Sequence, residues 1–100
     1  MEMNVTCSHG QVQVDLSGEM YVEDAAILRE KLGSNVESGN SQFIIKINRL
    51  NYIDSSGLGV LVGLQKRAQQ AGGGVILVGA NGMVKELFEV SRLNRVFEMR

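Results

Sequence analysis

The sequence predicts an α/β domain in which helices pack against one mixed β-sheet. Segments in which apolar and polar side chains alternate are followed by segments with helical spacing, and this exchange repeats along the chain. The 100 residues match the size of one domain, and no linker, repeat or low-complexity tract divides them. We therefore expect one domain over residues 1–100, with elements in the order β-β-α-β-α-β-α-β.

Two strands are expected at the start of the chain. Residues 11–18 (QVQVDLSG) alternate apolar and polar side chains, which is the pattern of a strand with one buried face. Residues 2–8 alternate in the same way, and His9 and Gly10 are placed to form a hairpin turn between the two strands. Cys7 has no other cysteine to pair with, so we expect it to pack as a small apolar side chain.

The other elements follow from changes in the same patterns. The runs FIIKI and VILVG are short and rich in β-branched residues, which is typical of strands covered on both faces. Asn81 is expected to cap the last helix. That helix is expected to have an apolar face of Met83, Leu87 and Val90. The expected elements are helix 22–36, strand 43–47, helix 56–71, strand 75–79, helix 81–93 and strand 95–100.

A serine pair stands at a junction between strand and helix, in the stretch YIDSSGLG. Asp and Ser are preferred at helix N-caps, because their side-chain oxygens accept hydrogen bonds from unpaired backbone amides. Capping by Asp54, Ser55 and Ser56 is therefore one interpretation of the pair.

Features behind the serines favour an additional role. Gly57, Gly59 and Gly63 lie in the first half of the helix, where each glycine costs about 0.5–1 kcal/mol relative to alanine. Close approach of another backbone, from the sheet beneath or a partner above, would compensate this cost. The same half of the helix is apolar on nearly every side, so part of it is expected to be exposed as a docking surface. These apolar residues are Leu58, Val60, Leu61, Val62 and Leu64.

Catalysis at the serines is not expected. A nucleophilic serine needs a base within hydrogen-bond reach, and the one histidine, His9, belongs to the N-terminal hairpin. The stretch SSGLG lacks the glycine that stands two residues before the serine in the G-x-S-x-G motif. No phosphate-binding loop motif is present, so no bound nucleotide or other cofactor is expected.

Composition argues against other classes of function. The formal net charge is −1 and the ten basic residues are spread along the chain, so no nucleic-acid-binding stripe is expected. No apolar run has the roughly 18–20 residues that a membrane span needs. The N-terminus lacks the basic and apolar blocks of a signal peptide. We therefore expect a cytoplasmic protein that neither binds nucleic acid nor inserts into a membrane.

Phosphorylation is the remaining possibility for the serine pair. A phosphoserine carries about −1.5 to −2 charges, and the free amides at a helix N-terminus favour an anion there. The domain is then expected to stay folded when it is modified, while a protein docked over the serine is repelled. This layout suits a reversible protein–protein switch.

The sequence resembles the STAS domain of bacterial anti-sigma factor antagonists over nearly its whole length. The resemblance rests on the upstream VDLSGEM, the DSSGL block, the glycines before VILVG and the late LFEVSRLNRVF. It implies a single STAS-like domain that is not an enzyme. Members of the family bind an anti-sigma factor that is also a serine kinase, and this binding frees a sigma factor to join RNA polymerase.

The resemblance also implies the residues of the site. The kinase uses its own ATP and magnesium to phosphorylate the second hydroxyl residue of the D-S-[ST]-G motif, which is Ser56 here. A serine phosphatase removes the phosphate. Ser55 is the neighbour at the cap, and Asp54 helps to shape the site. The residues expected to meet the partner are Glu19, Tyr21, Asp54, Ser55, Ser56, Gly57, Leu58 and Gly59.

One position departs from the family pattern. The family often carries G-E-[hydrophobic]-D beside the phosphorylated helix, and Tyr21 stands here in place of the final acid. Glu23 and Asp24 are candidates to supply the missing charge. Some STAS proteins act instead as non-enzymatic subunits of lipid-transport or stress-signalling assemblies. A permanently docked subunit without phosphorylation is therefore the alternative function.

Overall fold

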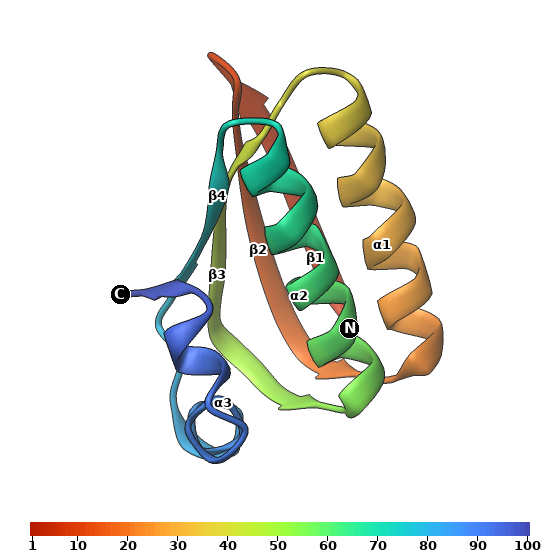
Figure 1. Ribbon diagram of the computed structural model, residues 1–100. Helices are drawn as coiled ribbons and strands as arrows, with labels where there is room; N and C mark the ends of the chain where they lie inside the picture. The colour runs from red at the N-terminus through yellow and green to blue at the C-terminus, as the bar shows by residue number, and fades with distance from the viewer.

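A five-stranded mixed sheet forms the centre of the computed structural model, which describes residues 1–100 (Figure 1). The strands lie in the order β1-β2-β3-β4-β5, with β1 antiparallel to β2 and the other pairs parallel. The predicted fold class and order of elements are confirmed. The elements are β1 (Glu2–Ser8), β2 (Gln11–Met20), α1 (Val22–Glu37), β3 (Gln42–Ile53), α2 (Ser55–Gln70), β4 (Gly74–Val78), α3 (Gly82–Val90), the short 3₁₀ turn η1 (Leu93–Arg95) and β5 (Glu98–Met99).

The helices α1 and α2 lie side by side on one face of the sheet (Figure 1). The connections from β2 to β3 and from β3 to β4 each move one strand along the sheet in the same direction. Because such connections are right-handed, their helices lie on the same face of the sheet. The other face of the sheet is therefore not covered by these helices, and the prediction that the strands at 43–47 and 75–79 are covered on both faces is wrong. Phe43 and Ile45 are fully buried, whereas Ile44 between them is partly exposed.

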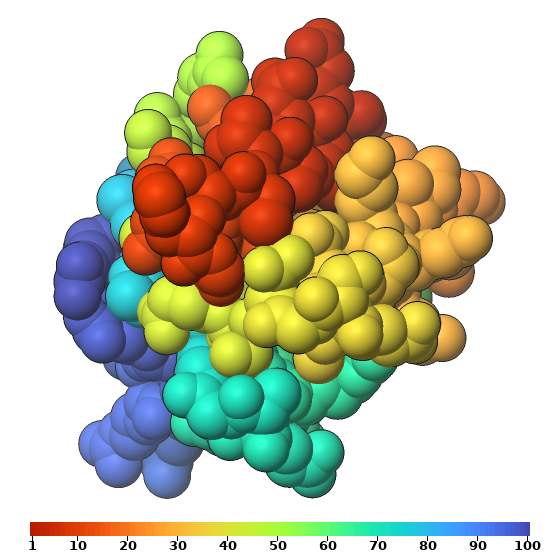
Figure 2. All heavy atoms as spheres, turned by 90° about the horizontal axis from the view of Figure 1, so that it is seen from above, coloured from red at the N-terminus to blue at the C-terminus, as the bar shows by residue number.

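The two ends of the sheet carry different parts of the chain. The β1–β2 turn and the segments that follow α1 and α2 gather at one end, which Figure 2 views directly. The opposite end carries the carboxyl ends of β2 and β3 and the starts of α1 and α2 (Figure 1). His9 lies in the β1–β2 turn, so it is at the far end of the sheet from Ser55 and Ser56.

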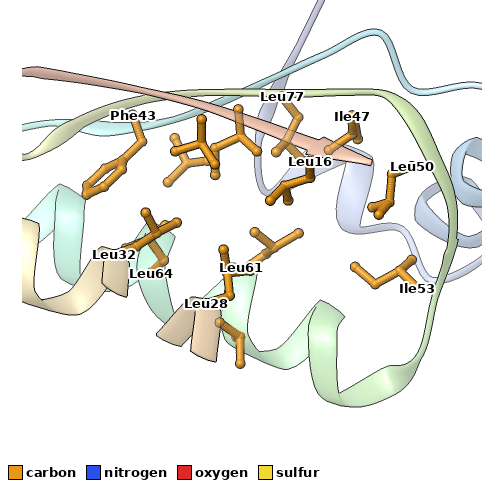
Figure 3. Close-up of a cluster of buried hydrophobic side chains, with 14 of the residues drawn as sticks. Leu16, Leu28, Leu32, Phe43, Ile47, Leu50, Ile53, Leu61, Leu64 and Leu77 are labelled. Carbon is orange, nitrogen blue, oxygen red and sulfur yellow. The ribbon is translucent and has the colours of Figure 1, made fainter. Parts of the chain in front are cut away.

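A cluster of 21 buried apolar residues forms the core. In Figure 3, Leu16, Phe43 and Leu77 of the strands face Leu28 of α1 and Leu61 of α2. Burying one side chain of this size contributes about 1.5–3 kcal/mol. This packing fixes how α1 and α2 lie on the sheet, and it thereby fixes the distance between the two helices.

β3 is longer than predicted, because it continues through NRLNYI to Ile53. Two register shifts interrupt its pairing with β2. The buried residues at its end, Ile47, Leu50 and Ile53, are therefore three positions apart instead of two. The regular alternation that identifies a strand in a sequence is lost here, but the strand carries the chain directly to the start of α2.

The last helix and the last strand are shorter than predicted. α3 ends at Val90, and Arg92 then adopts a left-handed conformation (φ 61°) before the turn η1. The predicted apolar face is right only for Leu87, which packs partly buried against the core; Val84 and Phe88 are the fully buried residues of α3, and Val90 is 84% exposed. Met83 is also exposed. The helix has apolar residues on two sides, and only one side meets the sheet.

Two expectations about single residues also change. Cys7 pairs with Val12 on β2, yet it is exposed, because β1 is the edge strand and Cys7 lies near its end. Asn81 takes the N-cap position of α3 as predicted, but its side chain does not bond to the helix. Its amide donates instead to the carbonyl oxygens of Asn48 (3.0 Å) and Gly79 (2.9 Å).

Candidate functional site

The two segments predicted to form the site meet at one end of the sheet. Parallel pairing of β2 with β3 places Glu19 opposite Tyr52 and Met20 opposite Ile53. The amide of Asp54 then donates to the carbonyl oxygen of Met20 over 3.2 Å. Binding sites of α/β domains are generally found outside the carboxyl ends of parallel strands. The end of β2 and the start of α2 therefore form one continuous surface.

Asp54 caps α2 without help from the serines. Its backbone is extended, and its Oδ1 accepts a hydrogen bond from the amide of Gly57 over 3.0 Å. Ser55 and Ser56 are the first two helical residues, and neither hydroxyl makes a hydrogen bond in the structure. Ser55 is exposed and Ser56 is half-buried. Capping is thus confirmed for Asp54 and wrong for the serines, whose hydroxyls are free for other chemistry.

Both serines line a hollow between the first turns of α1 and α2, with a volume of about 410 Å³. A second hollow of about 180 Å³ extends it along the helix pair, because Arg29, Gly59 and Val60 line both. The two hollows together are termed the helix groove. The first hollow is lined by Val22, Ala25, Ala26 and Arg29 of α1 and by Ser55, Ser56, Gly59 and Val60 of α2.

The three glycines of α2 are of two kinds. A Cβ on Gly57 would lie 2.6 Å from Cγ1 of Ile53 and from Sδ of Met20. Contact with the sheet therefore leaves no room for a side chain at this position. A Cβ on Gly59 or Gly63 would have no neighbouring atom within 4 Å. Nothing inside the molecule requires glycine at these two positions, and both present open backbone to the helix groove.

The prediction that α2 exposes an apolar docking surface is wrong. Three of the five predicted residues are buried, and the other two, Leu58 and Val62, are half-buried against the core. The reason is that α2 is in contact with the sheet, with α1 and with the chain that follows α3. Exposed apolar side chains occur instead on α1, where Val22 at the edge of the groove is 55% exposed.

Tyr21, at the position where the resemblance implies an acid, directly precedes α1. Its amide donates to Oδ2 of Asp24 over 2.9 Å, and its phenol donates to Oε2 of Glu19 over 2.8 Å. The ring centroid lies 5.3 Å from that of Tyr52. The hydrogen bond to Glu19 raises the pKa of the Tyr21 phenol above its usual value, so this side chain is neutral at physiological pH. Asp24 thus accepts from the backbone of Tyr21 at the helix start, and Glu19 accepts from its phenol.

The predicted partner-binding residues fall into three groups. Ser55, Ser56 and Gly59 line the helix groove, whereas Gly57 and Leu58 pack against the core. The remaining three, at the carboxyl ends of β2 and β3, are Glu19, Tyr21 and Asp54. Their contacts with a partner stay predictions.

Sequence reasoning missed the wall of the groove that α1 supplies. Its residues recur at spacings of three and four, which place side chains on one face of a helix. That spacing was the available signal, but it does not show that α2 lies beside this face. The missed residues are Val22, Ala25, Ala26, Leu28, Arg29 and Leu32 of α1, with Arg67 of α2.

Two other kinds of functional feature are not found in the structure. No group of three or more His, Cys, Asp or Glu side chains is placed to hold a metal ion. None of its helices has the length and apolar character required to traverse a membrane. Because Ser55, Ser56 and Gly59 line it, the helix groove, together with the strand ends beside it, is the candidate functional surface.

Comparison with known proteins agrees with this geometry. The STAS domain family model matches residues 2–100. The anti-sigma-B factor antagonist of Bacillus subtilis (strain 168) is 31% identical over 99 residues, which cover 99% of this chain and 90% of the relative. The anti-sigma factor antagonist SpoIIAA in its unphosphorylated form superposes with a TM-score of 0.89 at 23% identity, over 99% of this chain and 88% of that one. The phosphorylated form of SpoIIAA from Bacillus gives a TM-score of 0.82 at 22% identity, over 99% and 91% of the two chains. By sequence and by fold, the chain belongs to the STAS domain family, with anti-sigma factor antagonists among its relatives.

Proposed function

We propose that this chain is an anti-sigma factor antagonist that is switched by phosphorylation of Ser56. It binds an anti-sigma factor that is also a serine kinase, and this binding releases a sigma factor for transcription. The relative named as an anti-sigma-B factor antagonist supports the role, and SpoIIAA has been solved in a phosphorylated form. The observation that carries the proposal is the free hydroxyl of Ser56 in the helix groove.

The position of Ser56 suits a switch that acts on binding and not on folding. Phosphorylation adds about −1.5 to −2 charges at the first turn of α2. The backbone amides and the dipole of the helix stabilise an anion there, so the domain stays folded. A partner docked over the groove has to bury that charge, and removing a dianion from water is costly. The phosphorylated chain therefore releases its partner.

The chain supplies the substrate of this reaction and none of its catalysts. The partner kinase brings ATP and magnesium and transfers a phosphoryl group to Oγ of Ser56. A serine phosphatase reverses the reaction, and the whole cycle takes place in the cytoplasm. The distance between His9 and the serines supports this division, because the one histidine of the chain is at the far end of the sheet from both hydroxyls and the Asp54 carboxylate is bound to the amide of Gly57.

Incubation with the cognate anti-sigma kinase, ATP and magnesium is expected to add one phosphate, measured by intact mass. Ser56→Ala abolishes the addition. Ser55→Ala is the matched control, because it removes an equally free hydroxyl one residue away and leaves phosphorylation intact. Ser56→Asp folds normally but binds the kinase at least about tenfold more weakly, which corresponds to 1.4 kcal/mol.

Two outcomes would contradict the proposal. Phosphorylation of Ser56→Ala as efficient as that of the wild type would assign the phosphate to another residue. A stable complex that is indifferent to ATP and to Ser56→Asp would favour the permanently docked subunit.

A further inference from the structure

A cation without a partner stands in the same hollow as Ser56. Arg29 of α1 is the one charged residue among the eight that line this hollow. Its side chain makes no ion pair and no hydrogen bond in the structure. Arg67, the other arginine of the helix groove, is engaged: it lies 3.7 Å from Glu37 and donates to the carbonyl oxygen of Gly33 over 3.4 Å. Arg29 is therefore free to bind an anion that appears in the groove.

The chemistry of Arg29 matches a phosphate. A guanidinium presents its donors in a planar fork, which binds two oxygens of one phosphate and forms stronger hydrogen bonds than neutral donors do. No acidic side chain lines either hollow to compete for the guanidinium. Gly59 lines the groove together with Arg29 and Ser56, and its missing side chain leaves space for the two charged groups to meet.

We infer that Arg29 binds the phosphate of phosphorylated Ser56 across the groove and thereby joins α1 to α2. This inference rests on the proposed phosphorylation of Ser56, and it adds the group of this chain that receives the phosphate. The pair occupies the space beside Gly59 in which a partner docks. Phosphorylation then acts twice: it adds negative charge, and it closes the groove from within.

The second ionisation of the phosphate provides a direct measurement. A nearby cation lowers the pKa of this step, which is about 6 in free phosphoserine, and a nearby carboxylate raises it. Asp54, two residues before Ser56, is the carboxylate closest to it in the sequence, and its side chain is bound to the amide of Gly57. The acids of α1 line neither hollow. All of these acids are the same in every variant below, so a difference in phosphate pKa reports Arg29.

The experiment installs phosphoserine at position 56 during protein synthesis, so no partner kinase is needed. We expect ³¹P NMR titration to give a phosphate pKa about 0.3–0.7 units higher in Arg29→Gln than in the wild type, because the charged hydrogen bonds to the dianion are lost. Arg29→Lys keeps part of the shift. Lys31→Gln, on the same helix but outside both hollows, is the matched control and titrates as the wild type.

Thermal unfolding of the same proteins gives a second readout. With phosphate present, the wild type is expected to unfold about 3–6 °C higher than Arg29→Gln, and without phosphate the two differ by less than about 1 °C. Identical titration curves and identical midpoints for the two phosphorylated proteins would overturn the inference. That result would leave the antagonist role intact, because phosphorylation by the kinase and binding to it are measured separately. Failure of the kinase to modify Ser56 would refute the proposed function without affecting the titration.

Discussion

Alanine at Gly59 is expected to stabilise the fold, whereas alanine at Gly57, two positions earlier, destabilises it. At Gly59 the new Cβ meets no atom within 4 Å, and the helix gains about 0.5–1 kcal/mol. At Gly57 the Cβ lies 2.6 Å from Ile53 and Met20, and overpacking of a core typically costs about 1–3 kcal/mol. The midpoints of urea unfolding measure both changes, and each variant is the control for the other.

Partner binding is expected to change in the opposite direction at Gly59. A partner seated in the helix groove approaches the backbone of α2, and a methyl group at Gly59 obstructs that approach. We expect the affinity for the anti-sigma factor to fall about tenfold, or 1.4 kcal/mol, in Gly59→Ala and further in Gly59→Leu. Lys66→Ala is the control, because Lys66 is exposed on α2 outside both hollows.

Gly59 lowers the stability of the helix, and no contact inside the molecule requires a glycine there. This combination is typical of a functional position. Wild-type affinity in both Gly59 variants would show that the partner does not use the groove. A loss of stability in Gly59→Ala would show that the groove is narrower than the structure indicates.

The difference between Gly57 and Gly59 could not be predicted from the sequence. Two residues along a helix correspond to a rotation of about 200°, so the two positions lie on nearly opposite sides of α2. The sequence shows the cost of both glycines equally. Which of them faces the sheet depends on how α2 lies on the core, and this is decided by side chains of β2 and β3 that are distant in the sequence.

The junction that carries the serines was predictable because its signals are local. Asp54 caps the helix that begins one residue later, and the strand before it ends at Ile53. The helix groove was not predictable, because α1 and α2 are separated in the sequence by the whole of β3. α3 gives a similar lesson: Met83 and Leu87 have the same four-residue spacing as Val84 and Phe88, and only tertiary packing selects the second pair.

Gln65→Ala is expected to cause a large loss of stability. Gln65 is the one polar residue of the core and is 5% exposed. Its Oε1 accepts from the amide of Val75 over 2.7 Å, and its Nε2 donates to the carbonyl oxygen of Val96 over 2.7 Å. The hydrogen bond to Val75 is buried and the one to Val96 is partly buried. A buried group left without a partner costs about 1–3 kcal/mol, so we expect a total loss of about 2–4 kcal/mol. For a domain of this size the melting temperature falls by about 10–20 °C.

The same glutamine allows stability to be separated from function. Gln65 joins the start of β4 to the chain between η1 and β5, and it lines neither hollow of the helix groove. Gln65→Ala at a temperature well below its midpoint should therefore be phosphorylated at Ser56 and bind the kinase as the wild type does. Gln69→Ala, exposed on the same helix, should stay within about 0.5 kcal/mol of the wild-type stability. Equal melting of the two glutamine variants would show that these hydrogen bonds contribute little. A loss of kinase binding by folded Gln65→Ala would place part of the partner surface on the opposite side of α2 from the groove.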